Sequence, residues 1–333
     1  MKEAMLYEKL SRNLVRCNLC SHRCVIGDGK RGICRVRENI GGFLYSLVYG
    51  KVVSMNIEPI EKKPLFHFMP KSYSISVGTM GCNFKCRHCQ NSDISQVGDR
   101  DIKGRQLSPE NLVKIAAEKA CKSISYTYNE PTVFFEYAYD TALLSRKHDI
   151  SNVFVTNGYM SEETLNMIHP YLDAANIDIK AFSDDFYKKI CGAHLEPVLK
   201  SAKLMKKMGT WVEITTLIIP GYNDNFDELA EIATFIAKEL GKETPWHISR
   251  FYPSYKLTDA PPTPVSAIKK AREIGLEQGL KYVYTGNLPG DEGENTYCPK
   301  CGEVLVERYG YSIENKMQNN KCKKCGEMID GVF

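Results

Sequence analysis

The sequence predicts an α/β fold in which a parallel sheet forms a partial (β/α)6-type barrel of the TIM kind. Three observations support this class. Apolar segments of strand character recur along the central chain, amphipathic helical segments separate them, and chemically notable residues fall at the ends of the strands. Strict alternation of strand and helix indicates parallel pairing through crossover helices. A doubly wound open sheet is the alternative arrangement.

The individual elements follow from composition and periodicity. We expect strands at 73–79, 123–128, 152–156, 174–179, 211–219, 246–251 and 281–285. We expect helices at 108–120, 132–147, from 161 onward, at 225–240 and at 264–278, with further helical sequence between 180 and 210. Ser108 is a good N-cap and Pro109 suits the first turn of its helix.

The chain divides into three parts. Residues 1–70 form a cysteine-rich N-terminal segment, residues 71–289 form the barrel, and residues 290–333 form a C-terminal tail that begins in a Gly- and acid-rich linker. A chain of 333 residues is long enough for one large domain with such additions.

Composition and charge narrow the class of protein. The chain has no apolar run long enough to cross a bilayer and no signal-peptide pattern at its start, so we expect a cytoplasmic protein without a membrane partner. The net charge of +4 is too small to indicate nucleic acid. The tail, with six basic and five acidic residues over 298–333, does not favour that partner either.

Cysteine is abundant and clustered. The chain has thirteen cysteines, and only Cys121 and Cys191 stand alone. Without an export signal, clusters of this kind indicate metal sites rather than disulfides. The three clusters are Cys17, Cys20, Cys24, Cys34; Cys82, Cys86, Cys89; and Cys298, Cys301, Cys322, Cys325.

The two clusters of four predict saturated metal centres. In the tail, "CPKCG" and "CKKCG" are two similar turns that point four thiolates at one ion, which is typical of a structural zinc ribbon. A rubredoxin-like iron site is the alternative there. The N-terminal spacing suits either zinc or an auxiliary iron–sulfur cluster. We favour zinc for it, because a small Gly-rich segment needs a structural staple.

The central cluster stops at three. "CNFKCRHC" provides Cys82, Cys86 and Cys89 with no fourth cysteine nearby. A [4Fe–4S] cluster held by three thiolates keeps one iron open, which is what a cluster needs to bind a substrate or cofactor directly.

With this loop placed after the first barrel strand, the chain resembles the radical S-adenosylmethionine (SAM) superfamily, within it the pyruvate formate-lyase activating enzyme-like group, and most closely the radical SAM member of the AmmeMemoRadiSam system. "PIEKKPLFHFMP", "YTYNEPT", "VTNGY", "NIDIKAF", "IPGYND" and "GNLPG" contribute to the resemblance, which spans most of residues 17–290.

The resemblance implies which residues bind SAM. Glu130 of "YNEP" would accept the SAM ammonium, although Tyr128 and Asn129 stand where the family usually has glycines. The alternatives are a helix N-terminal acid for Glu130, a turn residue for Asn157, a structural ion pair for Asp178 and Lys180, and a buried satisfied side chain for His247. In the SAM-binding interpretation Asn157 approaches SAM, Asp178 and Lys180 contact it from one side of a strand, and His247 touches its ribose.

The resemblance also implies activity and partners. Reductive cleavage of SAM by the cluster would give a 5′-deoxyadenosyl radical that takes hydrogen from a small molecule or a protein. The alternatives are a glycyl-radical enzyme activase and a non-catalytic iron–sulfur or zinc protein. We expect an electron donor such as ferredoxin or flavodoxin, and the family name implies the partner proteins of the AmmeMemoRadiSam system.

Overall fold

Eight strands form the central sheet, in the order β16–β15–β14–β13–β12–β11–β9–β8. The computed structural model describes residues 1–98, 101–310 and 312–333. Pairing is parallel from β9 to β16, and β8 joins antiparallel beside β9. The strand bounds are β8 Ser54–Pro59, β9 Tyr73–Gly78, β11 Ser123–Tyr126, β12 Ser151–Thr156, β13 Ala174–Asp178, β14 Trp211–Ile218, β15 Trp246–Arg250 and β16 Val283–Gly286.

The predicted α/β class and partial barrel are confirmed. In the part of the chain that the structure describes, β8 and β16 are the two edges of the sheet, so the barrel stays open. The expected strands are all present, with ends that differ by up to two residues. The sequence analysis missed β8, which lies within the predicted N-terminal segment and yet forms an edge of the barrel sheet. Five of its six residues are half-buried or exposed, as suits an edge strand rather than a core strand.

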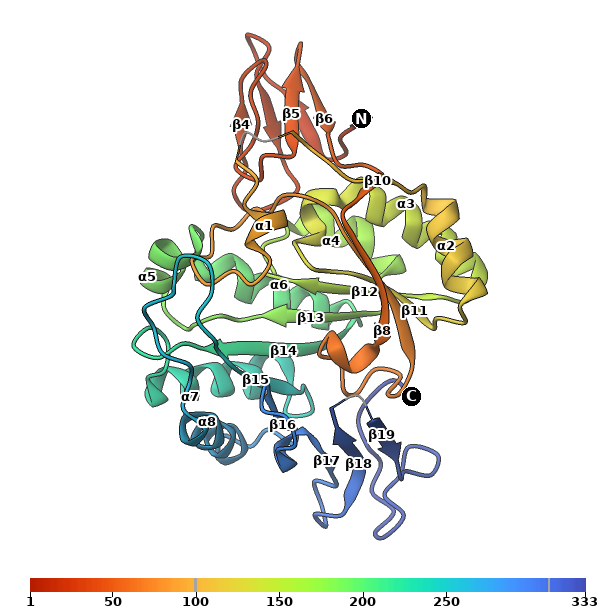
Figure 1. Ribbon diagram of the computed structural model, residues 1–333, viewed down its shortest axis with the longest axis vertical. Coiled ribbons are helices and arrows are strands. Elements are labelled where there is room, and N and C mark those ends of the chain that lie inside the picture. Colours follow the sequence, from red (N-terminus) through yellow and green to blue (C-terminus); the bar gives the residue numbers. More distant parts are fainter. Residues whose placement is uncertain (99–100, 311) are drawn as a thin grey trace.

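Helices cover the outer side of the sheet (Figure 1). Ser108 caps its helix as expected, since its hydroxyl accepts the Asn111 N–H at 3.3 Å, and Ser161 does the same for Thr164. The helices are α1 Ser92–Ser95, α2 Pro109–Glu118, α3 Phe135–Ser145, α4 Glu162–Ile168, α5 Asp184–Phe186, α6 Leu195–Lys207, α7 Phe226–Phe235 and α8 Val265–Glu277. Short 3₁₀ helices are η1 Ile60–Lys62, η2 Pro131–Phe134, η3 Arg146–His148, η4 His169–Tyr171 and η7 Glu292–Glu294, and η5 Tyr187–Cys191 and η6 Ile236–Leu240 are π-helical.

Small antiparallel sheets flank the barrel at both ends of the chain (Figure 1). The N-terminal sheets have the orders β1–β6–β5 and β2–β3–β4, the C-terminal sheet has the order β17–β18–β19, and β7 pairs with β10. Their bounds are β1 Lys2–Glu3, β2 Tyr7–Lys9, β3 Val15–Cys17, β4 Val25–Ile26, β5 Arg37–Ile40, β6 Phe43–Ser46, β7 Lys51–Val52, β10 Arg105–Gln106, β17 Thr296–Tyr297, β18 Val304–Tyr309 and β19 Ser312–Asn315.

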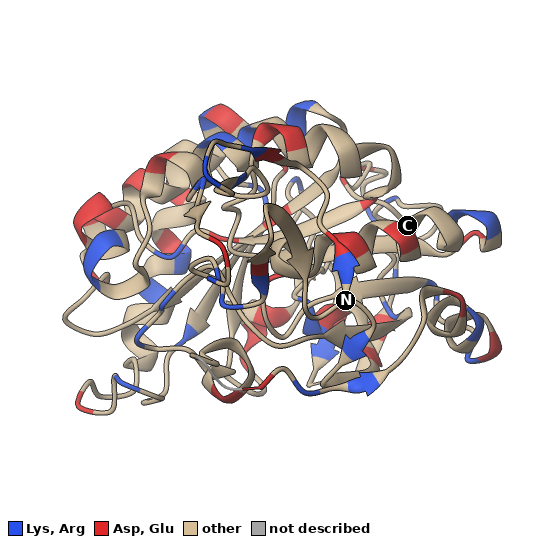
Figure 2. Ribbon diagram, turned by 90° about the horizontal axis from the view of Figure 1, so that it is seen from above, with Lys and Arg blue, Asp and Glu red and all other residues tan. Residues whose placement is uncertain are grey.

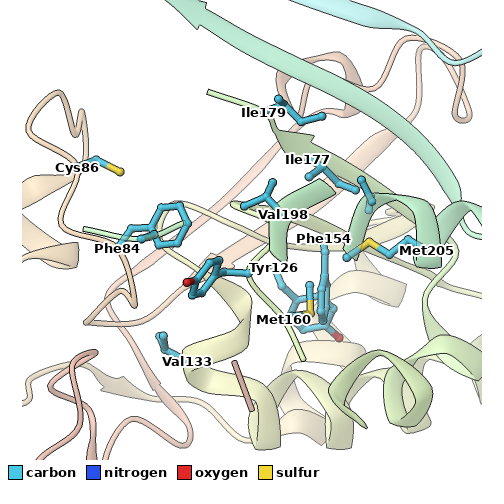
Figure 3. Close-up of a cluster of buried hydrophobic side chains, with 14 of the residues drawn as sticks. Phe84, Cys86, Tyr126, Val133, Phe154, Met160, Ile177, Ile179, Val198 and Met205 are labelled. Carbon is cyan, nitrogen blue, oxygen red and sulfur yellow. The ribbon is translucent and has the colours of Figure 1, made fainter. Parts of the chain in front are cut away.

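Large apolar side chains from several strands pack between the sheet and the helices that cover it. Tyr126, Phe154 and Ile177 lie together in the core (Figure 3), and all three are fully buried. Phe84 of the cysteine loop reaches into the same cluster, where its ring lies 5.1 Å from that of Tyr159. Burial of a side chain of this size contributes about 2 kcal/mol, so Phe84 anchors the loop to the barrel.

Basic and acidic residues are interspersed along the outer helices seen from above (Figure 2), in keeping with the small net charge. Among the described helices, none combines the length and apolar character that a membrane crossing requires.

Candidate active site

A cavity of about 470 Å³ opens at the carboxyl ends of the barrel strands. This is the edge of a parallel barrel at which catalytic groups gather. The cavity brings together seven of the eight residues predicted for the central cluster and SAM: Cys82, Cys86, Cys89, Glu130, Asn157, Asp178 and Lys180.

The cysteine loop between β9 and α1 is held in place by backbone hydrogen bonds. The Lys85 N–H donates to the Cys191 carbonyl at 2.7 Å, and the Arg87 N–H donates to the Ile190 carbonyl at 3.0 Å. These bonds fix the loop to η5 on the far side of the cavity. Two of its sulfurs also have polar contacts, Cys82 with the Phe84 N–H at 3.4 Å and Cys89 with the Ser95 hydroxyl at 3.1 Å.

Sulfur spacing distinguishes this loop from the tail. In the described part of the chain, one set of potential metal-ligand atoms has every member within 4.8 Å of the others. This set consists of the sulfurs of Cys298, Cys301, Cys322 and Cys325. Pairs of sulfurs there are 3.5 and 3.6 Å apart. A tetrahedral zinc ion with Zn–S bonds of about 2.3 Å places its sulfurs about 3.8 Å apart. The tail therefore has the geometry of a single-ion site.

The three sulfurs of the cysteine loop are more widely spaced than a single ion requires, because they do not meet the same distance limit. In a [4Fe–4S] cluster each thiolate binds a different iron, so its ligands are separated by the width of the cluster. The loop residues thus fit a [4Fe–4S] cluster.

Glu130 is buried at the end of β11 and accepts hydrogen bonds from neutral donors. Its Oε1 accepts from the Thr132 N–H and hydroxyl and from the Thr156 hydroxyl, the last at 2.8 Å. Its Oε2 accepts from the Asn157 N–H at 2.8 Å. Burial raises the pKa of this carboxyl above its ordinary value. No basic side chain of the described residues forms an ion pair with Glu130, which leaves Oε2 able to accept from a cationic ligand.

Tyr128 preserves the backbone path that a glycine would take. Its φ is +67°, in the left-handed region that Tyr rarely adopts. Its hydroxyl donates to the Glu58 carboxylate at 3.1 Å and accepts from Asn56 at 3.0 Å. These contacts offset the backbone strain of about 1 kcal/mol, so Tyr128 is held in a conformation that glycine adopts freely.

Asn157 and the Asp178–Lys180 pair lie on the other strands of the cavity. The Asn157 amide donates to the Asn83 side chain at 2.8 Å and lies 4.0 Å from the Cys82 sulfur. Lys180 forms an ion pair with Asp178 at 2.7 Å. Burial opposes its charge, but Asp178 and Cys86 together raise the pKa of Lys180 above its ordinary value.

The structure places His247 away from the cavity. It is the second residue of β15 and lies toward the amino ends of the strands, where its Nε2 is 2.6 Å from the Glu213 carboxylate. Phe66 and Tyr284 pack on its ring. Ser249, two residues further along the strand and on the same side, lines the cavity instead. The expected ribose contact of His247 is corrected to a buried polar contact, since the residue lies too early in its strand.

Sequence reasoning did not connect the lone Cys191 with the active site. It is fully buried in η5, and its backbone carbonyl accepts the Lys85 N–H at 2.7 Å, which brings it beside Cys86. Nothing in the sequence connects a lone cysteine in a helical segment with the loop around Cys86, because only the fold brings η5 against that loop.

Comparisons with known proteins agree with this geometry. Residues 76–236 match the radical SAM superfamily. The chain is 55% identical over 93% of its length to the uncharacterized protein MJ0808 of Methanocaldococcus jannaschii, of which it covers 92%. The chain belongs to the radical SAM superfamily.

More distant relatives point to one branch of that superfamily. The chain is 24% identical over 60% of its length to the pyruvate formate-lyase-activating enzyme of Clostridium pasteurianum and covers 87% of that protein. It is thus a radical SAM enzyme related to the pyruvate formate-lyase-activating enzymes, and this superfamily implies a [4Fe–4S] cluster and SAM.

Solved structures share the fold. The crystal structure of Streptococcus suis SuiB bound to its precursor peptide SuiA matches 69% of this chain with a TM-score of 0.52 and 13% identity, although the match spans only 52% of SuiB. A radical SAM methyltransferase from Sphaerobacter thermophilus matches 71% of each chain with a TM-score of 0.51 and 14% identity.

Proposed function

We propose that the cavity binds SAM on a [4Fe–4S] cluster held by Cys82, Cys86 and Cys89, and that the enzyme takes hydrogen from a small molecule or a protein. The observation that carries the proposal is the composition of the cavity wall. Among the described residues that line it, the cysteines number three, and they lie beside the buried Glu130 carboxylate and the Lys180–Asp178 ion pair. When bound, the cluster supplies the electron that splits SAM to a 5′-deoxyadenosyl radical.

Different side chains around the cavity bind different groups of SAM. Glu130 has a free acceptor position on Oε2 for the ammonium, in a buried setting where a charge-assisted hydrogen bond is strong. Lys180 offers a cation for the carboxylate, and Asp178 holds its side chain in place. Asn157 ties the cysteine loop to the end of β12 and so sets the distance between cluster and SAM.

A cluster of charged side chains forms part of the cavity wall. Lys62 and Lys63 both form ion pairs with Glu58, and all three line the cavity. Although burial opposes ionisation, the two lysines lower the pKa of Glu58 to about 2. Glu58 is therefore a carboxylate at neutral pH, held between the two lysines.

The test is anaerobic reconstitution with iron and sulfide, followed by dithionite and SAM. We expect 5′-deoxyadenosine and methionine by mass spectrometry, and their absence with Cys86→Ala. Cys121→Ala is the matched control, because Cys121 is also buried but does not line the cavity. No cleavage by the wild-type enzyme, or undiminished cleavage by Cys86→Ala, would overturn the proposal and favour the non-catalytic alternative.

A glycyl-radical activase is the second candidate, because the relatives include a pyruvate formate-lyase-activating enzyme and a putative glycyl-radical enzyme activating enzyme of Methanocaldococcus jannaschii. An activase leaves a radical on a protein backbone. Electron paramagnetic resonance of the reaction with candidate proteins separates the two, since a small-molecule substrate leaves no persistent protein radical. A reduced ferredoxin or flavodoxin is the proposed electron donor in either case.

A further inference from the structure

The four N-terminal cysteines surround a second hollow, separate from the cavity of the active site. Cys17, at the end of β3, and three later cysteines line it: Cys20, Cys24 and Cys34. The segment between the first two is docked on the barrel, because the Ser161 N–H donates to the Leu19 carbonyl at 3.1 Å and the Ser161 hydroxyl donates to the Asn18 carbonyl at 2.6 Å. The hollow therefore lies at the junction of the N-terminal segment and the barrel.

The sulfurs around this hollow are not spaced for one ion. In the described chain, no three of these four sulfurs lie within 4.8 Å of one another, whereas the four in the tail do. The same structure thus contains one four-cysteine set with the close spacing of tetrahedral zinc and one set with wider spacing. The wider spacing matches the loop of Cys82, Cys86 and Cys89, in which each sulfur meets a different iron.

The surroundings of the hollow suit a buried, negatively charged group. Arg37 is 2% exposed and lines it, with a bidentate ion pair to Glu136 at 2.9 and 2.6 Å. Its Nε has no hydrogen-bond partner among the described residues, and neither has the Nδ2 of Asn83, a residue that is 1% exposed and also lines the hollow. Buried donors without acceptors are costly, and cluster sulfides or thiolates would accept from both.

We propose that Cys17, Cys20, Cys24 and Cys34 hold a second [4Fe–4S] cluster rather than zinc. A four-thiolate zinc ion carries a similar negative charge, so Arg37 does not separate the two metals. Sulfur spacing does, because a zinc ion would have to draw the four ligands inward from a backbone that is already bonded to the barrel.

This second site lies next to the active-site loop. Asn83, which follows Cys82, lines the N-terminal hollow, and its carbonyl is 2.8 Å from the His22 Nε2. At Gly81 an added Cβ would lie 2.8 Å from the Cys34 carbonyl, so the two backbones are nearly in contact. Residues 81–83 thus border both sites.

This proximity gives the second cluster a role that rests on the proposed function. The reduced N-terminal cluster gives up one electron, and the cluster on Cys82, Cys86 and Cys89 takes it up. A low-potential one-electron donor of the ferredoxin or flavodoxin class then restores the first. The electron path runs through the short contact at Asn83, and no other co-reactant is consumed.

Metal analysis tests the site without depending on activity. We expect about eight iron atoms, eight sulfides and one zinc per reconstituted chain. The triple variant Cys82→Ala, Cys86→Ala, Cys89→Ala should retain about four iron atoms and, after dithionite, the paramagnetic signal of one reduced [4Fe–4S] cluster. The double variant Cys17→Ala, Cys20→Ala should also lose about four of the eight iron atoms, and it should keep its one zinc ion.

Zinc in place of this iron would overturn the proposal. The decisive result would be a triple variant with no iron and about two zinc ions per chain. This result concerns only the metal content of the triple variant, which is inactive toward SAM in any case. Failure of the proposed function would appear differently, as absence of SAM cleavage by an iron-loaded wild type. Metal and sulfide counts on the wild type keep the test decisive if a variant fails to fold.

Electron transfer from the N-terminal cluster to the active-site cluster, here called the relay, is tested by a separate measurement. With the double variant, we expect SAM cleavage driven by reduced flavodoxin to fall roughly tenfold more than cleavage driven by dithionite, a small reductant that reaches the active-site cluster directly. Equal losses with the two donors would overturn the relay.

Discussion

The Oε2 atom of Glu130 accepts the backbone N–H of Asn157 at 2.8 Å, and this bond joins the ends of β11 and β12 under the cavity. One carboxylate thereby orders the two loops that border the cysteine loop. The same carboxylate is the proposed acceptor of the SAM ammonium.

Replacement of Glu130 by Gln should weaken SAM binding more than it destabilises the fold. The amide has one acceptor oxygen and adds two donors among groups that are themselves donors, so we expect a loss of about 1–3 kcal/mol in the free energy of unfolding. We also expect roughly a hundredfold weaker SAM binding, because the charge is gone. Calorimetric titration with SAM and denaturant unfolding measure the two effects. Exposed Glu196→Gln is the control, and SAM affinity equal to wild type in Glu130→Gln would exclude the proposed contact.

Gly81→Ala should disturb both cysteine sites. The residue has φ +90°, and an added Cβ would lie 2.5 Å from a Val36 methyl and 2.8 Å from the Cys34 carbonyl. We expect a loss of about 2–4 kcal/mol from backbone strain and overpacking. Gly41→Ala is a matched control with φ +62° and open space around it, so it shows the cost of the backbone conformation alone. Thermal unfolding and iron content give the comparison, and equal losses would show that the contact with Cys34 has no effect.

Cys191→Ala should leave the iron content unchanged and alter the cluster it borders. Because the Cys191 thiol lies beside Cys86, its removal takes a weak hydrogen-bond donor from the surroundings of a thiolate ligand. Hydrogen bonds to cluster sulfurs raise the reduction potential, so we expect a lower midpoint potential by redox titration. Cys121→Ala, also buried and distant from the cavity, should leave the potential at the wild-type value. Loss of iron from Cys191→Ala would instead identify Cys191 as a ligand.

His67 should make stability depend on pH. It is fully buried, with Nδ1 at 2.6 Å from the Asp330 carbonyl and Nε2 at 2.6 Å from the Tyr284 hydroxyl. Burial lowers its pKa to about 4, and Glu213, Arg308 and His247 act on the same ring.

The unfolded chain therefore binds a proton below about pH 6.5 that the folded chain takes up only near pH 4. Its contribution is present above pH 6.5 and is lost as pH falls toward 4, up to about 3 kcal/mol. Denaturant unfolding between about pH 5.5 and 7.5 should show a flatter pH dependence in His67→Gln than in wild type. Exposed His148→Gln should keep the wild-type slope, and a slope unchanged by His67→Gln would contradict the assignment.

The sequence by itself determined the parallel α/β class, the three groups of cysteines and the position of seven residues at one end of the barrel. Those features follow from local periodicity and from the rule that parallel strands place their carboxyl ends together, so residues such as Glu130 and Lys180 could be assigned to a shared cavity.

Tertiary structure decided the features that depend on distance. Depth along β15 placed Ser249 in the cavity and His247 beside Glu213, because side chains two residues apart share a face but not a level of the barrel. Packing of η5 brought Cys191 to Cys86, and the separation of sulfurs distinguished the N-terminal cysteines from the tail. Spacing in sequence limits which residues can share a metal, but the distance between thiolates, which the whole fold sets, selects the metal centre.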